Sequence, residues 1–239
     1  ISTASHEMRT PVASIEGYLG LALNPNTATI DDRGRDFILK AHEAAQHLGR
    51  LFQDLLDVSK SEDGRMTNIP KVIDIVPFTQ TIVQGLTQKA TDKGLRLVFV
   101  PTDSSAQRKI MPVYFVNLDN DHLREVLDNL IENAIKYTKE GSVTIDVTGD
   151  VDHIVISVTD SGIGIPREDQ AHLFQKFYRV DNSDTREIGG TGLGLAIGYG
   201  LVTEVGGRVE AGRSEELGGA RFTVLLPGAA ASEEGEGKA

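Results

Sequence analysis

The stretch "LDNLIENAIKYT", Leu127 to Thr138, has the spacing of a helix with two different faces. Its apolar residues recur at three- and four-residue steps and can point to a core: Leu127, Leu130, Ile131 and Ala134. The same spacing places Asn129, Asn133 and Lys136 together on another face. Exposed asparagines are usually just solvated, but Mg²⁺ accepts side-chain amide oxygens together with phosphate oxygens. The stretch therefore predicts a helix that packs on one side and binds a ligand on another.

A glycine-rich turn, "DSGIGIP" from Asp160 to Pro166, follows directly on a strand-like run. Gly162 and Gly164 can adopt positive φ and let a ligand approach the backbone closely. A dinucleotide-binding loop needs a third glycine where Arg167 stands, so the Rossmann interpretation is disfavoured. Taken alone, the turn is compatible with either a ligand site or a purely structural role.

A second glycine cluster, "GGTGLGLAI" from Gly189 to Ile197, leads into a helical stretch. Backbone N–H groups in such a loop bind anions without any net positive charge. It is not a P-loop, because no Lys-Ser or Lys-Thr follows the glycines. The net charge of −11 argues against nucleic acid or an anionic membrane as a partner, so a triphosphate would depend on local groups of this kind. The absence of cysteine excludes disulfides, zinc fingers and thiol catalysis.

The first sixty residues form a separate pattern of two amphipathic helices joined by the loop "NPNTATID", Asn24 to Asp31. Their larger apolar residues recur at helical spacing: Ile1, Met8, Val12, Ile15, Leu19 and Ala22, then Phe37, Ala41, Ala44, Leu48, Leu51, Leu55 and Val58. A two-helix hairpin has too little core to stand alone, so we expect a homodimer that forms a four-helix bundle. The alternative is that this stripe packs on the remainder of the same chain.

From about Pro70 the pattern becomes mixed, which predicts an α/β sandwich with a mixed sheet and helices on one face. Strand-like runs occupy residues 95–100, 142–147, 154–160, 208–212 and 221–226, and helix-like runs occupy 120–137 and 193–205. We expect a helical hairpin over residues 1–63, a hinge over 64–70, a catalytic domain over 71–228 and a disordered acidic tail over 229–239.

The motif "SHEMRTP", Ser5 to Pro11, places a histidine on the solvent face of the first helix. At helical spacing, His6 lies about 150° from the centre of the apolar stripe, and Thr10 shares its face. His42 lies on the outer face of the second helix but has no following carboxylate or proline in register.

Taken together, these motifs resemble the catalytic core of a sensor histidine kinase of a two-component system. "SHEMRTP" resembles the H box, "NLIENAIKYT" the N box, "DSGIGIP" and "GGTGLGLAI" the two G boxes, and "LFQKFYR", Leu173 to Arg179, the F box. Five motifs in order are specific, and Met8 is a near-isosteric departure from the usual leucine. The resemblance implies a dimerisation and histidine-phosphotransfer hairpin followed by an ATP-binding domain shared with gyrase, Hsp90 and MutL.

The resemblance also implies roles in binding ATP and Mg²⁺. Asn133 would coordinate Mg²⁺ with help from Asn129, Lys136 would meet phosphate, Tyr137 would lie against the nucleotide, and Asp160 would accept a hydrogen bond from the adenine amino group. Four glycines would shape the pocket: Gly162, Gly164, Gly192 and Gly194. Three residues would anchor an ATP lid over about residues 175–190: Phe174, Phe177 and Arg179.

For the reaction, the resemblance implies that His6 attacks the γ-phosphate, with Glu7 as general base or orienting group. The phosphoryl group would pass to an aspartate of a response-regulator receiver domain, and Thr10 would assist its later removal from that regulator. Two alternatives remain: a non-catalytic nucleotide-binding dimeric scaffold and a hydrolytic ATPase of the gyrase or Hsp90 group.

No apolar run approaches the length of a membrane span, so we expect no membrane contact in this sequence and a cytoplasmic location. Because the chain opens in mid-helix at Ile1, we also expect upstream segments that could anchor a longer protein to a membrane.

Overall fold

The computed structural model describes residues 2–62, 68–101, 112–180 and 190–230, and leaves out the side chains of residues 2–11, 47, 50, 54 and 57–62. The chain divides into two compact units, Ile1–Met66 and Thr67–Ala239. Most of the expected hinge at 64–70 and most of the expected tail at 229–239 lie outside the described residues. Each unit is considered by itself.

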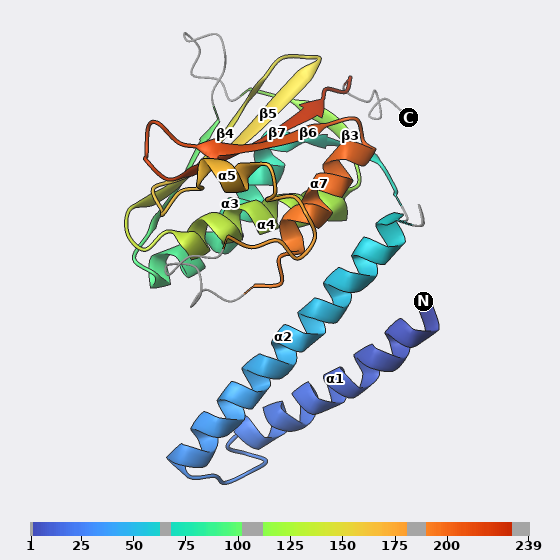
Figure 1. Cartoon of the computed structure of the whole chain (residues 1–239), viewed down its shortest axis with the longest axis vertical. Coiled ribbons are helices and arrows are strands. Elements are labelled where there is room, and N and C mark those ends of the chain that lie inside the picture. Colours follow the sequence, from blue (N-terminus) through green and yellow to red (C-terminus); the bar gives the residue numbers. More distant parts are fainter. Residues whose placement is uncertain (1, 63–67, 102–111, 181–189, 231–239) are drawn as a thin grey trace, which may run out of the picture. The chain divides into compact units, whose positions relative to one another are not determined.

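The first unit is a helical hairpin of α1, Ser2–Leu23, and α2, Asp32–Glu62 (Figure 1). The backbone of α1 is helical on both sides of Pro11, so the proline does not end the helix. Asp31 begins α2, because its carboxylate accepts a hydrogen bond from the Gly34 N–H at 2.7 Å. The hairpin and its connecting loop are where the apolar spacing predicted them.

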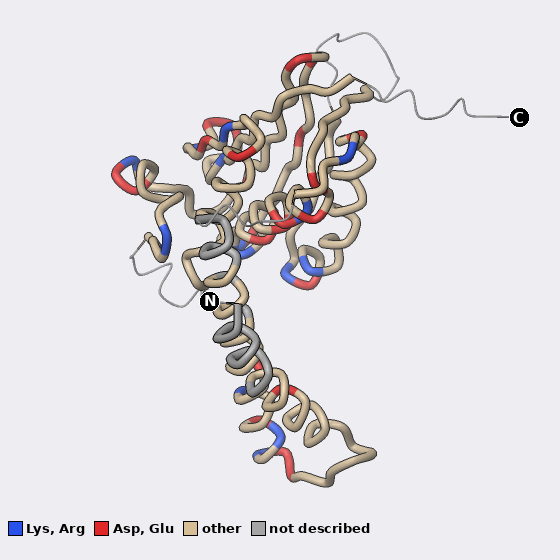
Figure 2. The backbone as a smooth tube through the Cα atoms, turned by 90° about the vertical axis from the view of Figure 1, so that its right-hand side faces the viewer, with Lys and Arg blue, Asp and Glu red and all other residues tan. Residues whose placement is uncertain are grey.

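The apolar stripe of this hairpin is largely exposed. Val12 of the stripe is buried, as is Ala45, which lies next to the stripe on α2. The large exposed members of the stripe are Ile15, Phe37, Leu48 and Leu55. Figure 2 shows charges of both signs gathered near the loop end of the hairpin, where Lys40 pairs with Asp36 at 2.8 Å. The hairpin therefore combines a mixed-charge end with an uncovered apolar stripe.

The second unit contains a five-stranded mixed sheet in the order β2-β4-β5-β7-β6. Its strands are β2, Arg96–Pro101; β4, Ser142–Gly149; β5, His153–Asp160; β6, Arg208–Arg213; and β7, Ala220–Pro227. Only the β2–β4 pair is parallel, and the remaining pairs are antiparallel. All five strands correspond to runs that alternation predicted, and the expected mixed sheet is confirmed.

Helices cover one face of this sheet: α3, Ile75–Asp92; α4, Asn120–Tyr137; and α7, Gly194–Glu204 (Figure 1). Alternate residues of β4 are completely buried beneath them: Val143, Ile145 and Val147. Helix α4 begins at its N-cap Asp119, whose carboxylate accepts hydrogen bonds from the N–H groups of Asp121 and His122. Seven of its residues are buried: Leu123, Val126, Leu127, Leu130, Ile131, Ala134 and Ile135. Its bounds match the predicted helix, and the arrangement with helices on one face is confirmed.

A second, two-stranded sheet was not among the predicted elements. It pairs β1, Lys71–Asp74, with β3, Phe115–Leu118, in antiparallel register. Strands of four residues are too short to show a periodic pattern, and their pairing joins segments far apart in the chain. Helix α3 and the short helix α5, Arg167–Gln170, were also not predicted.

Candidate nucleotide site

Helix α4 contacts both glycine-rich loops. Near the middle of α4, a Cβ added to Gly194 would lie 2.5 Å from Oδ1 of Asn129. The backbone at the start of α7 therefore lies so close to the Asn129 amide that only glycine fits at position 194. At the end of α4, a Cβ at Gly162 would lie 2.5 Å from the carbonyl oxygen of Tyr137. The structure thus brings the asparagine face and both predicted loops together along one helix.

The two glycines of the first loop differ in backbone conformation. Gly164 has the left-handed φ of 72°, whereas Gly162 has no positive φ and is needed for close approach of protein atoms. Gly162 therefore does not use the positive φ that a glycine allows. At this position the protein's own helix occupies the space that a side chain would need.

Asp160 lies at the end of β5 with only 3% of its surface exposed. Its Oδ1 accepts hydrogen bonds from the Gly162 N–H at 2.8 Å and the Ala220 N–H at 3.0 Å. Burial raises the pKa of this carboxyl group, and the two hydrogen bonds oppose that shift. A buried carboxylate with one oxygen held in this way is a specific acceptor for a polar ligand.

Sequence reasoning missed the contribution of the β6–β7 connection to this carboxylate. Ala220 supplies one of the two N–H donors. A Cβ at Gly219 would lie 2.3 Å from both the carbonyl oxygen and Oδ1 of Asp160. The only available signal was the glycine pair Gly218–Gly219 immediately before a predicted strand, which is typical of close backbone approach.

Two cationic side chains converge at Gly190, in the second glycine loop. Nζ of Lys136 would lie 2.7 Å from a Cβ at Gly190, and Nη1 of Arg179 donates to the Gly190 carbonyl at 3.3 Å. Burial lowers the pKa of Lys136, and the positive charge of Arg179 lowers it further. Lys136 also lies 5.2 Å from the ring centroid of Tyr137, and burial raises the pKa of that tyrosine. Two like charges held together favour an anion between them.

The base of the predicted lid is joined by a backbone hydrogen bond. The N–H of Phe177 donates to the Gly192 carbonyl at 2.9 Å. Among the described residues other than glycine, Phe177 alone has a positive φ, of 63°, and its side chain is exposed. Residues 181–189 of the predicted lid lie outside the described residues.

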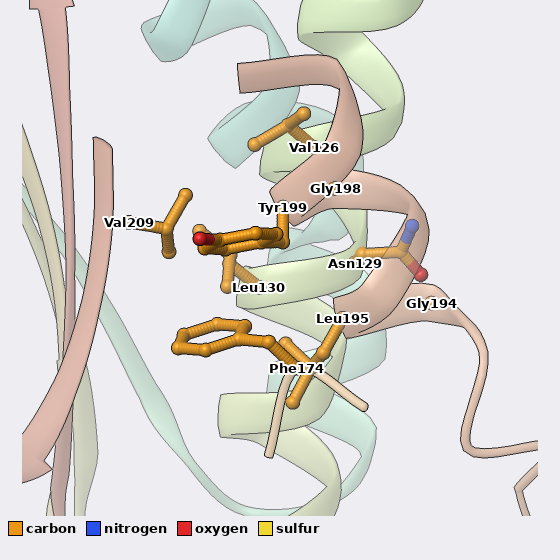
Figure 3. A pocket seen from close by; sticks show the side chains of 9 residues that line it. All are labelled: Val126, Asn129, Leu130, Phe174, Gly194, Leu195, Gly198, Tyr199 and Val209. Atoms are coloured by element: carbon orange, nitrogen blue, oxygen red, sulfur yellow. The ribbon is translucent and has the colours of Figure 1, made fainter. Parts of the chain in front are cut away.

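Phe174 belongs to an apolar pocket between α4, α7 and β6 (Figure 3). Its ring stacks on Tyr199 with centroids 5.1 Å apart. Val126, Leu130 and Val209 line the same pocket, and Figure 3 shows the Asn129 amide directed toward Gly194, away from the two rings. The pocket packs the F-box segment against α4 and α7.

Four further residues were predicted to belong to the site: Asn133, His6, Glu7 and Thr10. Asn133 is half-buried on α4, one turn after Asn129. His6, Glu7 and Thr10 belong to α1, but their side chains lie outside the described residues. Over the described ranges, no group of three or more His, Cys, Asp or Glu side chains could hold a metal ion. Within the same ranges, no helix has the length and hydrophobicity to cross a membrane.

Comparisons with known families match both units. Residues 1–64 match the His Kinase A (phospho-acceptor) domain, and residues 118–230 match the histidine kinase-, DNA gyrase B- and HSP90-like ATPase family. The chain is 34% identical to the circadian input-output histidine kinase CikA of Synechococcus elongatus, over 95% of this chain and 29% of the relative. It is also 34% identical to the sensor histidine kinase WalK of Bacillus subtilis, over 95% of this chain and 36% of the relative. The chain thus spans about a third of the length of these relatives.

Solved structures agree with this assignment. Full-length ShkA, crystallised in complex with AMPPNP, superposes with a TM-score of 0.79 at 27% identity, over 97% of this chain and 46% of that one. The histidine kinase AdeS of Acinetobacter baumannii shares the fold, with a TM-score of 0.62 at 22% identity over 93% of this chain and 97% of that one. Because two family models match in order and nearly the whole chain aligns with named kinases, the chain belongs to the sensor histidine kinases of two-component systems.

Proposed function

We propose that this chain transfers the γ-phosphoryl group of Mg-ATP to His6 and then to an aspartate of a response-regulator receiver domain. One observation carries the nucleotide part of the proposal: α4 contacts both glycine loops and brings its asparagine face and Lys136 to them. The AMPPNP complex of ShkA supports ATP as the nucleotide.

Asp160 would select the base. Both backbone donors bind its Oδ1, and we assign Oδ2 to the exocyclic amino group of adenine. Guanine presents a carbonyl oxygen at the corresponding position, which a buried carboxylate repels. The site would therefore prefer adenine nucleotides over guanine nucleotides.

Lys136, Arg179 and the backbone of the second glycine loop would bind the triphosphate. Asn129 and Asn133 offer neutral amide oxygens one turn apart, a donor set that fits Mg²⁺ shared with phosphate oxygens. Asn133 would be the direct ligand, since Oδ1 of Asn129 lies against the start of α7. When bound, Mg²⁺ neutralises charge on the phosphates.

His6 would act as the nucleophile. One ring nitrogen, in the neutral imidazole, forms a bond to the γ-phosphorus while the bond to the β,γ-bridging oxygen breaks and ADP leaves. The other ring nitrogen passes its proton to an acceptor, and Glu7 is the adjacent candidate. The match of residues 1–64 to a phospho-acceptor domain supports this assignment.

Replacing His6 with Gln tests the proposal. The chain is incubated with Mg-ATP and its intact mass is measured before and after mild acid treatment. We expect the parent chain and the His42→Gln control to gain one acid-labile phosphoryl group, and the His6→Gln variant to gain none. Its ATP affinity should stay within about 2-fold, because all the residues assigned to nucleotide binding belong to the second unit. An adduct on the His6→Gln variant would contradict the assignment, and no adduct on the parent would favour the non-catalytic scaffold.

Thr10 would support dephosphorylation of the regulator. A hydroxyl can position water for attack on an aspartyl phosphate but has no evident part in attack by His6. We expect Thr10→Ala to keep most autophosphorylation while slowing phosphate release from the receiver by about 10-fold or more. Both rates are measured on the same preparation, and equal losses, or loss of autophosphorylation alone, would rule out a dedicated role in dephosphorylation. A small loss of stability with both rates kept would indicate that Thr10 only donates a helical hydrogen bond to the His6 carbonyl.

A further inference from the structure

Helix α4 does not end in the left-handed C-cap that is common at helix ends. Its last helical residue is Tyr137, and Thr138 follows in an extended conformation with φ −98° and ψ 119°. The last four carbonyl groups of any helix lack partners within the helix. In α4 these carbonyls belong to Ala134, Ile135, Lys136 and Tyr137. They therefore need donors from elsewhere.

Three different donors supply the missing hydrogen bonds. Oγ1 of Thr138 donates to the Ala134 carbonyl at 2.7 Å. The N–H of Ile163, in the first glycine loop, donates to the Tyr137 carbonyl at 3.4 Å. Nζ of Lys93 donates to the two carbonyls between them, those of Ile135 and Lys136, at 2.7 Å each. Lys93 is thus the single side chain that satisfies two of the four groups.

The backbone of Lys93 is itself held firmly at the end of α3. Lys93 is the C-cap of that helix, and Gly94 follows with φ 76°. The Leu95 N–H donates to the Ala90 carbonyl at 2.9 Å and the Gly94 N–H to the Thr91 carbonyl at 2.8 Å. This pair of bonds is the Schellman motif, and the burial of Leu95 completes it. The ammonium group is therefore carried by a defined helix end rather than by a loop.

We propose that Lys93 is a positioning residue for the nucleotide site, because its ammonium group caps α4 and so sets where Lys136 and Tyr137 lie. This inference rests on the proposed function of the site. A cation at a helix C-terminus also interacts favourably with the partial negative charge there. Without it, the last turn of α4 would lose two hydrogen bonds, and the turn carries a phosphate-binding lysine and the carbonyl that contacts Gly162.

The neighbouring Lys89 provides a matched control. It joins the same two helices through an ion pair with Glu132 at 2.5 Å, one turn before Lys93 on α3. Both partners of that pair are exposed, and exposed pairs of this kind contribute little. Lys89→Met therefore removes a lysine between α3 and α4 without touching the carbonyls at the end of α4.

Hydrogen exchange in the absence of nucleotide tests the cap directly. We expect the amides of residues 134–137 to exchange about 10-fold faster in Lys93→Met than in the parent, because the last turn opens more often. Lys89→Met and Lys93→Arg should exchange as the parent does, since arginine keeps a charged donor. Unchanged exchange in Lys93→Met would overturn the proposal. If Lys93→Met does not fold, the same exchange rates are measured on Lys93→Gln, whose side chain is neutral and shorter than lysine.

Calorimetric titration with Mg-AMPPNP tests the consequence for the site. We expect Lys93→Met to bind about 10-fold more weakly than the parent, with Lys93→Arg restoring affinity and Lys89→Met leaving it unchanged. A purely structural role would lower the melting temperature without changing affinity at a temperature where both proteins are folded. A parent chain that binds no Mg-AMPPNP would contradict the proposed function. A parent that binds it and a Lys93→Met variant that binds equally well would contradict only the role of Lys93.

Discussion

The Asp160 carboxylate is buried and held in a fixed orientation. These two features predict that the affinity for the nucleotide depends on pH. Burial raises the pKa of the carboxyl group above the usual value of 3.8. A hydrogen bond from the adenine amino group would favour the ionised form and lower that pKa again. By linkage, a nucleotide that prefers the ionised carboxylate binds more weakly as the pH falls through the raised pKa of the free protein.

We therefore expect the affinity for AMPPNP to fall between pH 7.5 and pH 5 by more in the parent than in Asp160→Asn. The asparagine Oδ1 can still accept the hydrogen bonds from Gly162 and Ala220, so the variant should fold. It should bind at least about 10-fold more weakly at pH 7.5, because it loses a charged acceptor. The affinity of each protein for AMPPNP is measured by titration at both pH values. Protonation of the nucleotide itself affects the parent and the variant equally, so it cancels in the comparison. An identical pH dependence in the two would exclude Asp160 as the titrating group.

At the scale of elements, the two ends of the predicted lid meet at Gly192. Its φ of 72° is left-handed, and a Cβ there would lie 2.8 Å from the carbonyl carbon of Phe177. An alanine would therefore push against the segment whose N–H bonds to the Gly192 carbonyl. The start of the lid and the loop before α7 depend on this one close approach.

Gly192→Ala should accordingly weaken Mg-AMPPNP binding by about 10-fold or more, because the Phe177 and Gly192 backbones must separate. Gly206→Ala is the matched control, since Gly206 has a similar φ of 78° but nothing within 4 Å of an added Cβ. In both variants the alanine must adopt a left-handed backbone conformation, which should lower the free energy of unfolding by about 1 kcal/mol. Thermal unfolding measures this loss of stability. Only Gly192→Ala should lose affinity beyond its loss of stability. Equal affinities for the two variants would argue that the lid base has no part in binding.

At the scale of the whole molecule, the exposed stripe on α2 predicts self-association. Leu48 has 42% of its surface exposed, and Phe37 and Leu55 on the same stripe are also exposed. Burying such side chains contributes about 1.5–3 kcal/mol each. A second copy of the hairpin could cover the stripe in a four-helix bundle, as the predicted homodimer requires.

Leu48→Glu should shift the chain from dimer to monomer, as measured by sedimentation or light scattering over a range of concentrations. Leu39→Glu is the control, because Leu39 is 41% exposed yet, at about 100° per residue, lies on the opposite side of α2. It should remain dimeric. If both variants behaved alike, or if the parent chain were monomeric, the stripe would not be the dimer interface.

Local patterns along the chain determined most of the secondary structure. Helix α4 occupies the predicted residues 120–137, because its apolar spacing and its Asp119 cap both act within a few residues. The five strands of the larger sheet follow from alternation in the same way. The order of the motifs determined the family, because each motif is a contiguous string of residues.

Only the tertiary structure decided which distant groups meet. The β1–β3 pair, the Ala220 donor to Asp160 and the reach of Lys93 to the end of α4 join segments separated by more than forty residues. Such contacts leave no periodic signal, because each depends on a single hydrogen bond or a short strand rather than on repeated spacing. Gly162 illustrates the difference: its sequence context was compatible with either a ligand site or a structural turn, and only the folded chain shows that its missing side chain makes room for the carbonyl of Tyr137.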